Sequence, residues 1–224
     1  MQKIFEPIFH AAYLITVITL GVRMIRLSEG QRYFILFGAM AIILGSGDSF
    51  HLIPRVYALL TTGLAANYSI LGAGKFITSI TMTIFYVILY KVWKERFQIQ
   101  SARGLDLTIY LLAAVRIVLC LLPGNGWLSA DPSLFYGILR NIPFAILGGT
   151  IMYLLYSSGK RENDRDFVNL SIGVFFSFLF YVPVVLFAGT APLVGMLMIP
   201  KTLAYVYIVF TGFSQLGQYQ LEKA

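Results

Sequence analysis

Seven long runs of apolar residues, separated by short polar segments, dominate the sequence. Each run is close to the ~20 residues that a helix needs to cross the hydrocarbon core of a bilayer. The runs are 5–25, 33–61, 69–92, 106–122, 134–156, 167–188 and 193–216. They predict an all-α integral membrane protein whose residues 1–224 form a single domain, a bundle of seven transmembrane helices.

Prolines mark two irregular spans. The second run is overlong and contains Pro54, so its helix is expected to kink there or to end and restart. The fourth run is the shortest and stops at Pro123. Near the N-terminus, Lys3 is the single charge before the apolar stretch, and Glu6 and Pro7 interrupt that stretch. This pattern is atypical of a cleaved signal peptide, so we expect a permanent first helix.

Basic residues in the connections predict the orientation. Lys and Arg occur in the first, third and fifth connections and are absent from the second, fourth and sixth. Positively charged loops stay in the cytoplasm, so the N-terminus is expected outside and the tail 218–224 inside. We expect a multi-pass protein of the plasma membrane, with the lipid bilayer as its surroundings.

Composition agrees with this class and excludes others. Hydrophobic residues make up 58% of the chain and charged residues 12%, whereas soluble proteins carry about 25% charged residues. The net charge of +7 forms no basic stripe, so a nucleic-acid partner is not expected. The single cysteine, Cys120, excludes an intrachain disulfide and is expected to be a small buried residue.

A weak internal repetition is present. Gly21 and Pro54 are separated by 33 residues, and Gly149 and Pro183 by 34. Two three-helix units joined by the fourth helix would produce such a pattern. Chance spacing of residues that are common in membrane helices is the simpler explanation.

Ionisable and polar residues inside the spans are the candidate functional residues. A charge at the bilayer centre costs at least about 2.5–3.5 kcal/mol, so such residues usually mark function. Most of them are expected in the outer half of the bundle: Glu6, His10, Asp48, His51, Arg55, Lys75, Arg116, Arg140, Asn141 and Lys201. The densest block runs from Gly45 to Arg55, where Gly45 and Gly47 would let another helix or a ligand approach.

Helical spacing groups some of these residues. Asp48, His51 and Arg55 follow an i, i+3, i+7 pattern and are expected on one face. Glu6 and His10 are four residues apart and are expected to share a face as well.

The charges in this layer do not balance. Five cations, Arg55, Lys75, Arg116, Arg140 and Lys201, face the two acids Glu6 and Asp48. Such an excess in a low dielectric is stable only if lysines lose protons or an anion enters. The sequence thus predicts an outward-facing, cation-rich pocket for an anionic small molecule or lipid headgroup, with Arg116 and Arg140 both essential for binding.

Three functions use such a pocket. An intramembrane lipid-modifying enzyme would use Asp48 and His51 for catalysis, with Arg55, Lys75, Arg116, Arg140, Asn141 and Lys201 holding the substrate. A carrier of an organic anion would use the same layer for binding, and a receptor or sensor would use it to detect a ligand. The sequence decides neither the cofactor nor the oligomeric state.

Other interpretations remain for individual residues. Arg55, Lys75 and Glu6 can snorkel to headgroups, Asp48 can pair with Arg116 or Arg55, and aromatic residues can form interfacial belts. Glu6, His10, Asp48 and His51 are ligand types for zinc, but the surrounding cations and the lack of a metal motif disfavour a metal. A retinal Schiff base at Lys201 is disfavoured because the third span contains no acid.

Overall fold

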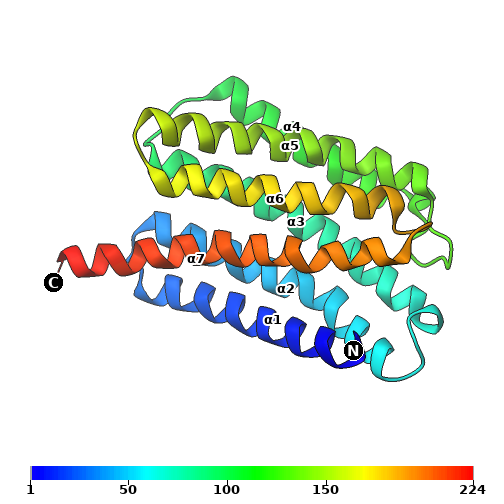
Figure 1. Cartoon of the computed structure of the whole chain (residues 1–224). Helices are drawn as coiled ribbons and strands as arrows, with labels where there is room; N and C mark the ends of the chain where they lie inside the picture. Colours follow the sequence, from blue (N-terminus) through cyan, green and yellow to red (C-terminus); the bar gives the residue numbers. More distant parts are fainter. Residues whose placement is uncertain (1, 224) are drawn as a thin grey trace.

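The computed structural model describes residues 2–223, apart from the side chains of Gln2, Lys3 and Pro192, and this part of the chain is helical with no strand (Figure 1). Its seven helices are α1 (Gln2–Leu27), α2 (Arg32–Leu60), α3 (Tyr68–Arg96), α4 (Arg103–Leu121), α5 (Leu134–Arg161), α6 (Arg165–Phe187) and α7 (Met198–Lys223). Short 3₁₀ turns lie in three connections, at Ala65–Asn67, Pro123–Asn125 and Pro192–Leu197. All seven helices are long and apolar enough to cross a membrane, which is compatible with the predicted multi-pass class.

Several boundaries differ from the predicted ones, most of all those of the seventh run. The seventh run begins as a 3₁₀ turn, and the α-helix starts only at Met198 and continues to Lys223. Residues 218–223, predicted as a tail, are therefore helical. The hydropathy pattern marks only the apolar run and therefore does not predict where the helix ends. The helix continues beyond the run because Gln, Leu, Glu and Lys have high helix propensity in water as well. Pro54 lies inside a continuous α2, so the helix neither ends nor restarts there.

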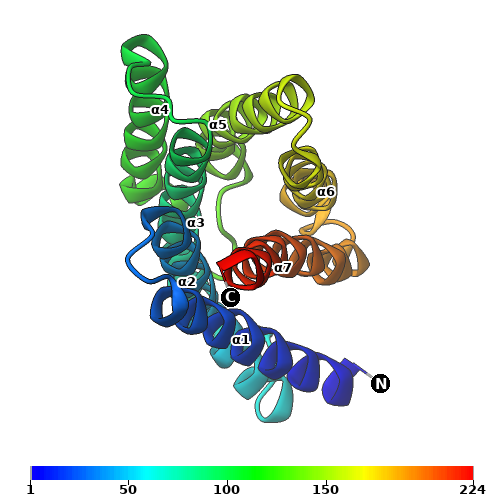
Figure 2. The same ribbon diagram turned by 90° about the vertical axis from the view of Figure 1, so that its left-hand side faces the viewer.

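The helices form two three-helix arrays. Viewed end-on, α1, α2 and α3 lie in one row, α5, α6 and α7 form the other, and α4 packs outside α3 and α5 (Figure 2). Contacts of α7 with α1 and α2, and of α3 with α5, join the arrays. The buried side chains between the arrays include Phe37, Leu44, Phe85, Val174 and Ile208.

Glycines allow close packing within the first array. A Cβ atom at Gly38 of α2 would lie 2.6 Å from the carbonyl oxygen of Gly21 in α1. A Cβ atom at Gly47 would lie 2.0 Å from Oγ1 of Thr81 in α3, and at Gly45 it would lie 2.6 Å from Cγ1 of Ile18. The approach of another helix predicted at Gly45 and Gly47 is confirmed. Small residues at such contacts are typical of membrane helices, where close packing replaces the hydrophobic driving force.

The two ends of the bundle differ in their polar contacts. We call the end formed by the connections 28–31, 97–102 and 162–164 and by the C-terminus the basic end. Its ion pairs are Arg32–Glu95, Lys94–Asp106, Arg96–Asp164, Arg161–Glu162 and Lys223–Glu29. The other end, which carries the N-terminus, holds most of the charges predicted to form the site.

Candidate functional site

The predicted site residues separate into three groups. The α1–α2 group is Glu6, His10 and Arg55. The central cluster is Asp48, Arg116 and Lys201, which come from α2, α4 and α7. The loop group is Arg140 with its contacts to the connection between α4 and α5. His51, Lys75 and Asn141 lie beside these groups.

The α1–α2 group is a local ion pair. Arg55 donates from Nε to Oε2 of Glu6 (2.9 Å) and from Nη2 to Oε1 (3.3 Å). His10, one turn along α1, places Nε2 3.9 Å from the same carboxylate, so the expected shared face of Glu6 and His10 is confirmed. Arg55 and Glu6 therefore neutralise each other, and neither is available to hold a substrate without breaking this pair.

The predicted face of α2 is divided between two neighbours. Asp48 and Arg55 both reach α1, at Tyr13 and Glu6. His51 instead interacts with the backbone of Leu71 in α3. Asp48 and Arg55 point in the same direction because the seven residues between them make almost two whole helical turns. His51, three residues after Asp48, is rotated by about 60° around the helix axis. Asp48 and His51 therefore point to different helices.

Asp48 is a half-buried residue of α2 that contacts α1. The Tyr13 hydroxyl of α1 donates to Oδ2 of Asp48 at 2.6 Å. The cation whose charge acts on this carboxylate is Lys201 of α7. An ion pair of Asp48 with Arg116 or Arg55 was the alternative interpretation, and among the described residues neither arginine forms an ion pair with Asp48. The arrays fold together across α2 and α7, a juxtaposition that sequence spacing does not encode.

Lys201 is buried among aromatic rings. Its side chain and backbone together are 7% exposed. Its Nζ lies 4.6 Å from the ring centroid of Tyr181 and 5.3 Å from that of Tyr205, within the range of cation–π attraction. Tyr205 follows Lys201 by one helical turn, which is the signal from which its place in the cluster could have been inferred.

Arg116 is a buried arginine of α4. It is 2% exposed, and its guanidinium carbon lies 3.2 Å from the centroid of the Phe144 ring in α5. One turn further along α4 lies Cys120, which is fully buried, as expected of a small buried residue. Among residues 2–223, Nε and Nη1 of Arg116 have no hydrogen-bond partner. Buried polar groups are normally paired, so two unpartnered guanidinium nitrogens among the described residues are unusual.

Aromatic residues line the space around the central cluster. Tyr86 packs edge-on against Phe144, with ring centroids 5.1 Å apart, and its hydroxyl lies 3.0 Å from Oγ of Ser177. Tyr181 donates to Oδ1 of Asn141 at 3.0 Å. An interfacial belt was the expected role for such residues, and it is wrong for Tyr13, Tyr86 and Tyr205, which are buried in the bundle.

The loop group anchors the connection between α4 and α5. Arg140 donates to Oδ1 of Asn125 at 2.7 Å and lies over the Trp127 ring at 4.1 Å from its centroid. Asn125, which is completely buried, donates to the carbonyls of Leu119 and Leu122 at 2.8 and 2.7 Å. These contacts give Arg140 a structural role that the sequence did not suggest.

Replacement of Asn125 tests that role. Asn125→Ala leaves buried carbonyls at the end of α4 and one donor of Arg140 without partners, each costing about 1–3 kcal/mol where water cannot enter. We expect thermal unfolding in detergent to begin at a clearly lower temperature. Asn67→Ala is the matched control, because Asn67 bonds to Gly63 and Thr62 near the surface. An equal, small effect of both changes would contradict the anchoring role.

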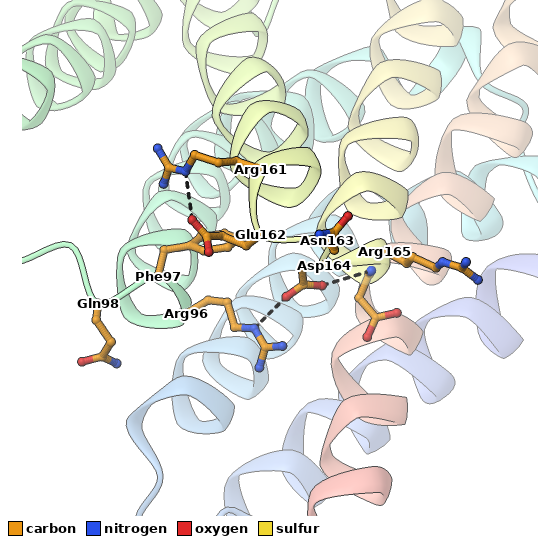
Figure 3. A pocket seen from close by; sticks show the side chains of 9 residues that line it. Arg96, Phe97, Gln98, Arg161, Glu162, Asn163, Asp164 and Arg165 are labelled. Atoms are coloured by element: carbon orange, nitrogen blue, oxygen red, sulfur yellow. Dashed lines mark hydrogen bonds and ion pairs between the residues drawn. The ribbon is translucent and has the colours of Figure 1, made fainter.

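Two cavities lie at the basic end. One, of about 700 Å³, is bordered by residues 96–98 of the α3–α4 connection and 161–166 of the α5–α6 connection (Figure 3). In this cavity Arg96 donates to Oδ2 of Asp164 at 2.8 Å (Figure 3). The second, of about 360 Å³, lies between α2, α3 and α7 and is lined by Tyr33, Asp166 and Gln215 among others. Both are at the opposite end from the predicted outer pocket.

The part of the chain from residue 2 to 223 contains no group of three or more His, Cys, Asp or Glu side chains that could hold a metal ion. Glu6, His10, Asp48 and His51, the candidate zinc ligands, are divided between the α1–α2 group, the central cluster and the α3 side of α2. The low-probability metal site therefore has no geometric support.

No protein-family model matches the sequence, no curated protein is significantly similar to it, and no solved structure matches its fold at a significant level. Conclusions about function therefore depend on the residues of this chain.

Proposed function

We propose that this protein is a membrane carrier that binds an organic anion at the central cluster, between its two three-helix arrays. Arg116 carries the proposal: a guanidinium 2% exposed, with two nitrogens lacking partners among the described residues. An isolated charge in low dielectric is costly unless an opposite charge accompanies it. A carboxylate, sulfonate or phosphate offers the acceptor geometry that a guanidinium prefers.

The surroundings favour an anion with an apolar or aromatic body. Phe144 lies against Arg116, and Tyr181 and Tyr205 lie against Lys201. Ligand sites typically combine apolar and aromatic walls with a few polar groups that fix orientation. A bare inorganic ion would leave the aromatic rings without a partner. An aromatic or amphiphilic anion, including a lipid with an anionic headgroup, would fit both the cationic groups and the aromatic rings of the site.

The arrangement of polar layers supports transport. The central cluster forms one layer, and a second layer at the basic end joins the arrays: Tyr33 hydrogen-bonds to Gln215, which donates to Asp166. Between the layers lie apolar, fully buried side chains, among them Phe37 and Ile208. An anion could leave toward the basic end only if the arrays moved apart there, the movement expected of carriers built from two helical units.

The orientation follows from the same proposal. The basic residues of the connections favour the basic end in the cytoplasm and the N-terminus outside. The central cluster would then be reached from outside, and the two cavities would open toward the cytoplasm. A place in the plasma membrane is part of this proposal.

Ligand-induced stabilisation tests the binding step. The purified protein is heated with benzenesulfonate, benzoate or phenyl phosphate, and in parallel with neutral benzamide. Binding to the folded state at about 100 times Kd adds about 2.7 kcal/mol, so at least one anion should raise Tm while benzamide does not. Uptake of that anion into proteoliposomes then tests transport. Absence of any anion-specific shift would overturn the proposal.

An intramembrane enzyme is the second candidate. One observation favours it: Nδ1 of His51 is buried without a hydrogen-bond partner in the described chain, so this imidazole could exchange a proton with a substrate. The separation of Asp48 from His51 weighs against it, because an orienting carboxylate would have to contact the imidazole. Incubation with anionic phospholipid vesicles, followed by mass spectrometry of the lipids, distinguishes turnover from binding.

A further inference from the structure

We propose that Asn141 of α5 is a positioning residue of the anion site, which acts by fixing the Tyr181 ring of α6 against Lys201. This inference rests on the proposed function, because it concerns the geometry of the same central cluster. The observation behind it is a hydrogen bond between two helices: the Tyr181 hydroxyl donates to Oδ1 of Asn141 at 3.0 Å. Asn141 then shapes the site through Tyr181, whereas the sequence suggested that it holds the substrate directly.

The amide group of Asn141 is oriented by its own helix. Its Nδ2 donates to the carbonyl oxygen of Gly137, one turn earlier in α5, at 2.8 Å. A carbonyl oxygen accepts hydrogen bonds and cannot donate them, so this contact directs the amide nitrogen to Gly137 and leaves the amide oxygen for Tyr181. The acceptor for the Tyr181 hydroxyl is therefore in place before any ligand binds.

The Tyr181 ring is located by one apolar and one polar contact. It packs edge-on against Phe144, with ring centroids 6.0 Å apart, and its hydroxyl is held by Asn141. Nζ of Lys201 lies 4.6 Å from the centroid of the same ring. Cation–π attraction depends on the position of the ammonium group over the ring face, so a displaced ring also displaces the preferred position of Lys201.

Prolines weaken both helices next to this contact. Pro143 follows Asn141 by two residues in α5, and Pro183 follows Tyr181 by two residues in α6. A proline inside a helix removes one backbone hydrogen bond and favours bending there. The hydrogen bond between Asn141 and Tyr181 thus joins the two helices at a level where each lacks a backbone bond, which increases its influence on the ring.

Two variants break this hydrogen bond from its two ends. Asn141→Leu removes the acceptor, whereas Tyr181→Phe removes a single hydroxyl and keeps the ring. We expect each to weaken binding of benzenesulfonate by roughly twofold to tenfold, the contribution of one neutral hydrogen bond. Because both changes break the same bond, the double variant should bind no more weakly than either single variant. Tyr153→Phe, at a tyrosine of α5 that is 67% exposed, is the matched control and should leave the affinity unchanged.

Other roles of Asn141 predict different patterns. A direct contact with the anion predicts that Asn141→Leu weakens binding equally with and without the Tyr181 hydroxyl, and that Tyr181→Phe alone has no effect. A merely structural bond between α5 and α6 predicts a lower unfolding temperature without ligand and an unchanged affinity in all three variants. Either pattern would overturn the positioning role and leave the proposed function intact. Absence of anion binding to the unaltered chain overturns the proposed function, and the positioning role with it.

Discussion

Arg116→Gln should abolish binding of benzenesulfonate while leaving the ligand-free protein as stable as before, or more stable. Truncating one partner of a buried charge pair costs about 2–5 kcal/mol of binding, which corresponds to a loss of affinity of roughly 30-fold to several thousand-fold. The empty protein gains from the same change, because it no longer buries a guanidinium with two unpartnered nitrogens.

The two measurements together identify the role of Arg116. Titration with benzenesulfonate gives the affinity, and thermal unfolding without ligand gives the stability. A structural arginine would show the reverse pattern, with lower stability and unchanged affinity. Arg103→Gln is the matched control, since Arg103 is an exposed arginine at the other end of the same helix. Retained affinity in Arg116→Gln would remove the main support for the proposed function.

Arg140 is expected to behave differently from Arg116, although the sequence placed both in one pocket. Its contacts with Asn125 and Trp127 satisfy part of its hydrogen-bonding capacity within the chain. The charge excess was inferred from counting residues in spans, and a count cannot show which cations have partners. Arg55 is a second cation that the count included as unpaired, although its charge is neutralised by Glu6.

The seven spans could be predicted because each depends on local hydropathy along its own helix. Partners that come from different helices could not. Asp48 meets Tyr13, and Arg116 meets Phe144, because α1 contacts α2 and α4 contacts α5. The helical period predicts which residues share a face, but it does not say which helix that face will meet. His51 shows the limit even within one helix, since a rotation of about 60° is enough to direct it to α3.

The tyrosines illustrate a second limit. Tyrosine is common at membrane interfaces, so abundance alone suggests a belt. Burial depends on the depth and the direction of each side chain. Tyr205 was accessible to sequence reasoning because it lies one turn from Lys201, whereas the place of Tyr13 depends on the packing of α1 against α2.

Gly74→Ala should strongly destabilise the protein, because the backbones of α2 and α3 approach closely at this glycine. A Cβ atom at Gly74 would lie 2.3 Å from the carbonyl oxygen of Phe50 and 2.7 Å from Cα of His51. Both are backbone atoms, which a change of rotamer cannot move. The helices must separate instead, and overpacking of this kind costs about 1–3 kcal/mol or more. Each kcal/mol lowers Tm by about 2–4 °C in a chain of this size.

Gly149→Ala provides the control for this prediction. Gly149 lies within α5, and nothing stands within 4 Å of the Cβ position there. Its replacement removes a poor helix former and should be neutral or stabilise by up to about 1 kcal/mol. Both variants replace a helical glycine with alanine, so the change in helix propensity is the same in each. The difference between their unfolding temperatures in one detergent therefore measures the effect of the α2–α3 contact at Gly74. Since separation of α2 from α3 also shifts Asp48 relative to Lys201, Gly74→Ala should weaken benzenesulfonate binding too. Equal stability of the two variants would show that α2 and α3 do not approach this closely.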